Sequence, residues 1–168
     1  MHQRPSLPEN HARRANARRA FSLVEMLTVL SILGLLTSYA VLRVGTTYQT
    51  TGTEGFVRTL MLDLRQARAR TISTGDNHYV LLTRTAGLVT SYTLYRATGS
   101  GDVVVDRSVM VPDGAVVTTA TDQWEFEFDG SLGTGTGSGT IVVAGPSFEW
   151  TVYIYRATGT LDATRVAL

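Results

Sequence analysis

The stretch from Arg18 to Leu42, RRAFSLVEMLTVLSILGLLTSYAVL, decides the fold of the N-terminal part of this chain. It joins a basic leader to an apolar run of 22 residues, Phe21 to Leu42, that carries a single charge. At about 1.5 Å per residue, a helix of this length spans a hydrocarbon core of about 30 Å. The charge is Glu25, and an unpaired carboxylate in a bilayer costs about 2.5 to 3.5 kcal/mol. The sequence therefore predicts a membrane-spanning helix whose one acid needs a partner.

The leader before this run is polar and basic. Residues 1–20 contain Pro5 and Pro8 and show no hydrophobic periodicity, so we expect no regular structure there. Five Arg and one Glu give them a net charge of +4, whereas the rest of the chain, with ten Arg and thirteen acidic residues, carries −3. Because Arg-rich flanks of a membrane helix stay in the cytoplasm, we expect the N-terminus inside and the C-terminal part outside.

A second helical pattern follows from about Thr53 to Ser73. Its apolar residues recur at helical intervals and so share one stripe: Phe56, Val57, Leu60, Met61, Leu64 and Ala67. Gly75 is expected to end this helix. Three glycines mark weak points between it and the apolar run: Gly45, Gly52 and Gly55. We expect one long helix whose first half lies in lipid and whose second half packs its stripe against a domain.

Beyond Gly75 the sequence changes to short β-branched or alternating runs separated by Gly, Asp and Pro. These runs predict eight strands: His78–Arg84, Leu88–Arg96, Val103–Val111, Val116–Thr119, Trp124–Asp129, Thr140–Ala144, Phe148–Arg156 and Leu161–Val166. Two of them have an apolar face, formed by Trp124, Phe126 and Phe128 in one and by Phe148, Trp150, Val152 and Ile154 in the other. No βαβ pattern is visible, so we predict an α+β fold in which antiparallel sheets pack on the helix.

The junction between the leader and the apolar run resembles a known processing signal. Ala20 precedes the residues FSLVE, which end at Glu25, as in the class III signal of type IV prepilins and type II secretion pseudopilins. The resemblance implies cleavage between Ala20 and Phe21 by a prepilin peptidase, with Ala20 where the family usually has Gly. It also implies N-methylation of the new amine at Phe21, and pairing of that amine with Glu25 of a neighbouring subunit during assembly.

The mature chain is similar to the GspH/FimT branch of minor pseudopilins and minor pilins. Three features carry this likeness: the helix-end residues Leu64, Ala67, Arg68 and Ala69, an F-x-x-x-G segment from Phe126 to Gly130, and a hydrophobic strand closing on a Gly, Val152 to Gly159. The resemblance implies a pilin-like fold, in which a long helix with a transmembrane half and an amphipathic half packs on a β-sheet domain.

Together, the pattern and the resemblance predict four segments. They are a cleaved prepilin leader, 1–20, a transmembrane and assembly helix, 21–43, its amphipathic continuation, 44–75, and a β-rich globular domain, 76–168. The expected function is that of a minor pseudopilin, a structural subunit of a type II secretion pseudopilus. It would cross the bacterial inner membrane once, with its domain in the periplasm. Its expected partners are the prepilin peptidase, other pseudopilins or pilins in a filament, and the inner membrane.

Three alternatives remain open at this point. The same signal serves minor pilins of type IV pili equally well. The apolar run could also be an ordinary signal anchor, or a secretory signal peptide cut after the small residues Ser38 and Ala40. In that case the chain would be an anchored or secreted β-rich binding domain with an exposed aromatic platform formed by Tyr92, Tyr95, Tyr153 and Tyr155.

The residues that usually carry chemistry are scarce. The chain has no Cys, and its histidines, His2, His11 and His78, form no cluster in the sequence, so we expect no catalysis, no metal site and no cofactor. The glycine-rich stretch Gly130–Gly139 lacks the Lys-Ser/Thr ending of a phosphate-binding loop and predicts a hairpin loop. Isolated Asp residues such as Asp102 and Asp106 fit solvated turns better than calcium ligands. We also expect no small-molecule substrate.

Nucleic-acid binding is also disfavoured by charge. Some FimT relatives take up DNA through paired basic residues after the C-terminal Gly, but after Gly159 this chain reads TLDATR. From Asp76 onward, five Arg stand against ten acidic residues, a net charge of −5. Such a domain repels phosphate.

Overall fold

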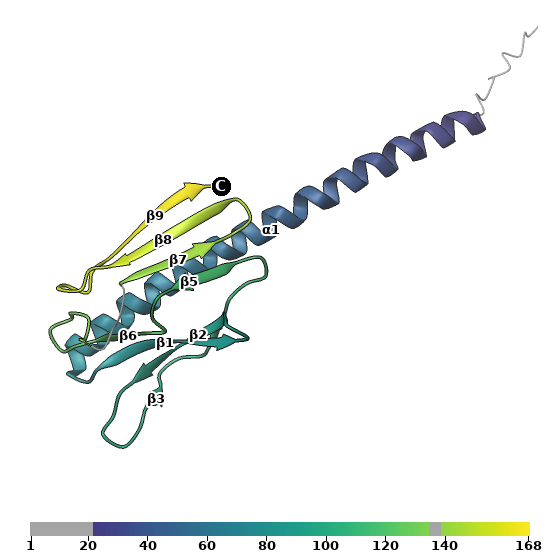
Figure 1. The fold of residues 1–168 in the computed structure, drawn as a ribbon. Helices are drawn as coiled ribbons and strands as arrows, with labels where there is room; N and C mark the ends of the chain where they lie inside the picture. Colours follow the sequence, from purple (N-terminus) through teal and green to yellow (C-terminus); the bar gives the residue numbers. More distant parts are fainter. Residues whose placement is uncertain (1–21, 135–138) are drawn as a thin grey trace, which may run out of the picture. The chain divides into compact units, whose positions relative to one another are not determined.

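The computed structural model describes the backbone of residues 22–134 and 139–168 and the side chains of these residues except 42–46. The chain divides into two compact units, Met1–Ala40 and Val41–Leu168. A single helix of 52 residues, α1 (Leu23–Thr74), contributes to both (Figure 1). The glycines that were expected to weaken the helix, Gly45, Gly52 and Gly55, do not interrupt it.

The helix ends where the sequence predicts. Gly75 adopts a φ of 75°, a conformation that costs little without a Cβ, and its N–H donates to the carbonyl of Thr71 at 2.9 Å. The first strand then begins at His78. The turn is fixed by Thr71, whose hydroxyl accepts a hydrogen bond from the backbone N–H of His78 at 2.9 Å.

The strands form two antiparallel sheets. One has the order β3-β2-β1-β6, with β4 also paired to β2, and the other has the order β5-β7-β8-β9. The first sheet contains β1 (His78–Thr85), β2 (Leu88–Arg96), β3 (Val103–Val104), β4 (Val109–Met110) and β6 (Gln123–Phe126). The second contains β5 (Val116–Thr119), β7 (Thr140–Ala144), β8 (Phe148–Ile154) and β9 (Leu161–Ala167). The predicted α+β fold is confirmed.

The core of the second unit lies between the helix and both sheets. The helix supplies the predicted stripe, in which Leu60 and Leu64 are fully buried. Figure 1 shows both sheets lying along this part of α1. The first sheet contributes Trp124 and the second contributes Ile141 and Val152, all with no exposed surface. Truncation of such a fully buried side chain typically costs about 2 to 5 kcal/mol.

Three strand predictions need correction. The predicted strand Phe148–Arg156 ends at Ile154. The run Val103–Val111 forms two short strands instead of one, because residues between them leave the ladder while Val105 and Val111 still donate to β2. The predicted strand from Trp124 to Asp129 ends at Phe126. Phe128 is therefore not on the apolar face with Trp124 and Phe126 but lies in a turn, 72 % exposed.

Candidate assembly site

Glu25 lies in the first turn of α1, and its side chain is exposed in the isolated subunit. Ser22 precedes the helix, and its carbonyl accepts the N–H of Met26 at 3.1 Å. Ser22 and Glu25 thus have the S-x-x-E spacing of a capping box, a signal that the sequence reasoning missed. A carboxylate is favoured at this end of a helix, where the macrodipole is positive. The first turn of α1 therefore stabilises the Glu25 carboxylate even before another subunit binds.

The helix around Glu25 is apolar on all sides. The segment Leu23–Val41 has a mean hydropathy of 1.8 and is long enough to cross a membrane. Its hydroxyl groups stay within the helix: Thr28 donates to the carbonyl of Glu25 at 2.9 Å and Ser31 to that of Leu27 at 2.8 Å. Such internal bonds let small polar residues lie in lipid or against another helix.

The two other residues predicted for this site lie outside the described residues. Ala20 and Phe21, which the resemblance assigns to cleavage and N-methylation, precede Ser22, where the description begins. Their roles stay predictions.

A second feature joins three distant parts of the sequence near the end of α1. The Nε of Arg68 donates to the carbonyl of Gly130 at 3.1 Å and to that of Thr158 at 2.8 Å. Gly130 follows β6 in the first sheet, and Thr158 lies between β8 and β9 of the second. Arg68 therefore connects the helix to both sheets.

Glycine is required at this junction. A Cβ on Gly159 would lie 2.0 Å from the carbonyl oxygen of Gly130, and one on Gly130 would lie 2.7 Å from Cδ1 of Ile72. Both glycines have positive φ, 61° and 82°. The three segments on which the expected resemblance to the GspH/FimT branch rests thus meet at one place, where the close approach of two turns excludes side chains.

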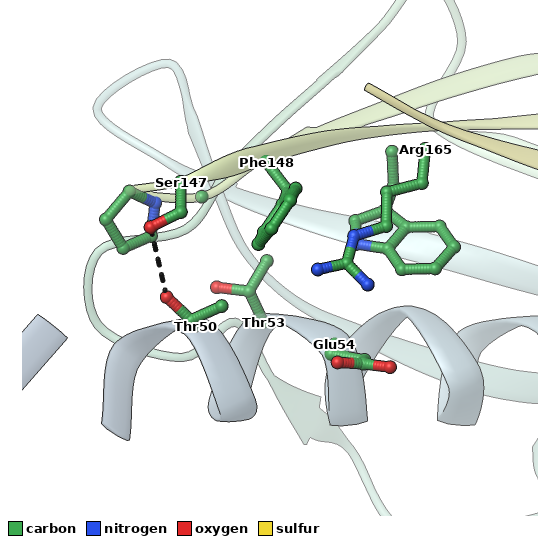
Figure 2. A pocket seen from close by; sticks show the side chains of 9 residues that line it. Thr50, Thr53, Glu54, Ser147, Phe148 and Arg165 are labelled. Carbon is green, nitrogen blue, oxygen red and sulfur yellow. Dashed lines mark hydrogen bonds between the residues drawn. The ribbon is translucent and has the colours of Figure 1, made fainter. Parts of the chain in front are cut away.

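A small hollow lies between α1 and the second sheet (Figure 2). Figure 2 shows Arg165 and Phe148 pointing from the sheet toward the helix, on which Glu54 lies. The guanidinium of Arg165 is 3.5 Å from the centre of the Phe148 ring, and the hydroxyls of Thr50 and Ser147 are 3.4 Å apart. The cavity volume is about 10 Å³, far below the roughly 300 to 1,000 Å³ of typical ligand pockets. The hollow is therefore a small gap in the packing between α1 and the second sheet and not a ligand pocket.

The four tyrosines proposed as an aromatic platform do not gather on one surface. Tyr92 belongs to the first sheet, is 1 % exposed, and donates its hydroxyl to Oδ2 of Asp63 on α1 at 2.7 Å. Burial and this carboxylate raise the pKa of the Tyr92 phenol far above its ordinary value. Tyr153 and Tyr155 are exposed on the second sheet and at its end. The platform prediction is wrong, because Tyr92 is part of the core.

Acidic side chains are spread over the described part of the second unit. Asp122 pairs with Arg84 at 2.7 Å and Asp76 with Arg96 at 3.7 Å. Among residues 22–134 and 139–168, no three His, Cys, Asp or Glu side chains come together as metal ligands would.

Comparison with known proteins adds one match. Residues 15–41 match the prokaryotic N-terminal methylation motif. The segment and the fold together support a protein of the pilin type, a class that includes type IV pilins and pseudopilins. The motif implies membrane anchoring, processing by a prepilin peptidase and assembly with other pilins. No curated protein and no solved structure matched the chain.

Proposed function

We propose that the chain is a minor pseudopilin of a type II secretion system, related to the GspH/FimT branch. The observation that supports this most is the continuity of α1, which carries the matched N-terminal motif at one end and the Arg68 junction near the other. In this proposal the leader is removed after Ala20, Phe21 becomes the methylated N-terminus, and the domain lies in the periplasm.

The subunit acts as a structural part of the filament and carries no catalysis of its own. Glu25 sets the register between subunits, because its carboxylate pairs with the cationic amine of Phe21 on a neighbour. In a low-dielectric surrounding an unpaired charge is costly, so only one relative position of two helices is favourable.

The variant Glu25→Ala tests this role in the full-length protein. We expect processing to remain largely intact and incorporation into the filament fraction to fall by about tenfold or more, since the loss of one buried pair costs several kcal/mol. Thr28→Ala, one turn further along the same helix, is the matched control and should incorporate normally. Normal incorporation of Glu25→Ala into the filament fraction would refute the proposed role of Glu25 in setting the register between subunits.

Copurification identifies the system. The proposed secretion role predicts that the tagged full chain, co-expressed with the pseudopilins and with the type IV pilins of one host, recovers the pseudopilins. Recovery of pilins alone would show instead a minor pilin of type IV pili, which the same motif serves.

A further inference from the structure

The outward face of α1 in the second unit carries an exposed leucine between two arginines. Arg58, Leu62 and Arg65 are spaced at i, i+4 and i+7 and so share one face of the helix, opposite the buried stripe. Leu62 is 60 % exposed, and the side chain of Arg58 is 74 % exposed although it pairs with Glu54 at 2.9 Å. Within the described residues, Arg65 makes no hydrogen bond or ion pair. We name these three residues the helix patch.

The turn after β6 presents the opposite chemistry. Glu127, Phe128 and Asp129 stand in succession, and Phe128 is 72 % exposed, so it contributes little to the core of its own subunit. Neither acid has an Arg partner within 4.0 Å among the residues that the structure describes. We name these residues the acidic turn.

The acidic turn is held in place before any partner binds. The N–H of Gly130 donates to the carbonyl of Glu127 at 2.7 Å, and the N–H of Ser131 donates to Oδ1 of Asp129 at 2.8 Å. Arg68 then fixes the turn to the helix through the Gly130 carbonyl. A preorganised turn loses little conformational entropy on binding.

Among the described residues of one subunit, no ion pair joins the helix patch to the acidic turn. Gly130 lies against Ile72, since a Cβ there would be 2.7 Å from the Ile72 side chain. Leu62 precedes Ile72 by ten residues, about 15 Å along the helix. The two surfaces can therefore meet between two molecules that are displaced along the helix axis.

We propose that the helix patch of one subunit binds the acidic turn of a second copy of this chain. The chemistry is complementary, because two bases flanking a leucine face two acids flanking a phenylalanine. Such a head-to-tail contact uses different surfaces on each molecule and produces an open series of subunits when the rotation between them does not close a ring. The inference rests on the proposed function for its setting in a filament, and it needs only two copies in succession.

Cysteine cross-linking tests the contact, since the chain has no Cys of its own. The full-length variants Leu62→Cys and Phe128→Cys are co-expressed with a prepilin peptidase, and membranes are treated with a short bismaleimide. We expect dimers when both variants are present, and few with either alone. The matched control replaces Phe128→Cys by Met110→Cys, a position 67 % exposed on β4. Equal yields with the control, equal self-linking of either variant, or no dimer would each refute the contact.

Charge reversal tests the role of the arginines. Adding Arg65→Glu to the Leu62→Cys chain should lower the dimer yield by about tenfold, and adding Glu127→Arg to the Phe128→Cys chain should restore it. An unchanged yield with Arg65→Glu alone would refute the charge pairing. The same gels also show whether the leader has been cleaved. Cleavage without dimers would refute this contact but not the proposed function. Dimers without cleavage would refute the proposed function but not this contact.

Discussion

The two parts of α1 differ in where their apolar side chains lie. Along Leu23–Val41 the apolar residues are found on every side, and all side chains are exposed in the single subunit. Along Thr53–Thr71 the buried residues form one stripe against the sheets. The second part of the helix is therefore stabilised within the subunit, whereas the first part needs surroundings that the subunit does not supply, such as lipid or other helices.

Leucine truncation in each part gives the largest expected contrast. Leu60→Ala should lower the free energy of unfolding by about 2 to 5 kcal/mol, because Leu60 is fully buried in the core. Leu33→Ala should change it by less than about 0.5 kcal/mol, because Leu33 is 52 % exposed. Thermal unfolding of the detergent-solubilised full chain, followed by near-ultraviolet circular dichroism, measures both. Equal losses would show that the two parts do not differ in this way.

Glycine substitution sharpens the same contrast with a smaller effect. Gly159→Ala should destabilise the chain by about 2 kcal/mol, because the new Cβ would meet the Gly130 carbonyl and the residue has a positive φ. Gly34→Ala, in the first part of α1, should be neutral or stabilising by up to about 1 kcal/mol, since nothing lies within 4 Å of its Cβ position. The same unfolding measurement compares them, and a neutral Gly159→Ala would contradict the packing at the Arg68 junction.

The smallest effect is expected from alkaline pH. The pKa of Tyr92 is raised by burial and by Asp63, so the folded state holds the phenolic proton more tightly than the unfolded state. This contribution is fully present below about pH 10 and is lost as the pH rises above it, by up to about 1.4 kcal/mol per pH unit. Urea unfolding at pH 8, 10 and 11 should show a shallower loss for Tyr92→Phe than for the unchanged chain. If the free energy of unfolding fell equally steeply with pH in both proteins, Tyr92 would not be the cause of the alkaline destabilisation.

The elements of the fold could be predicted from the sequence because each depends on a local pattern. The helical spacing from Phe56 to Ala67 indicates the buried stripe, and alternation along Phe148–Ile154 indicates a two-faced strand. Phe128 misled the prediction because its spacing from Trp124 and Phe126 continues the alternation, although the strand ends before it.

Only part of the candidate site could be predicted from the sequence. Glu25 could be singled out because a charge inside an apolar run is anomalous within a few residues of sequence. The Arg68 junction could not be derived, because its three segments, at residues 68, 130 and 158, meet only after both sheets have formed. The prediction of an exposed platform that includes Tyr92 fails because strand alternation does not show which face of the sheet the helix covers.

The most direct test of the account of this protein as a processed pilin-type subunit is the intact mass of the membrane-extracted full chain, expressed with and without a prepilin peptidase. We predict a peptidase-dependent mass that corresponds to a chain beginning at N-methylated Phe21. A chain that begins at Val41 without the peptidase, or one that remains uncut in its presence, would contradict the assignment.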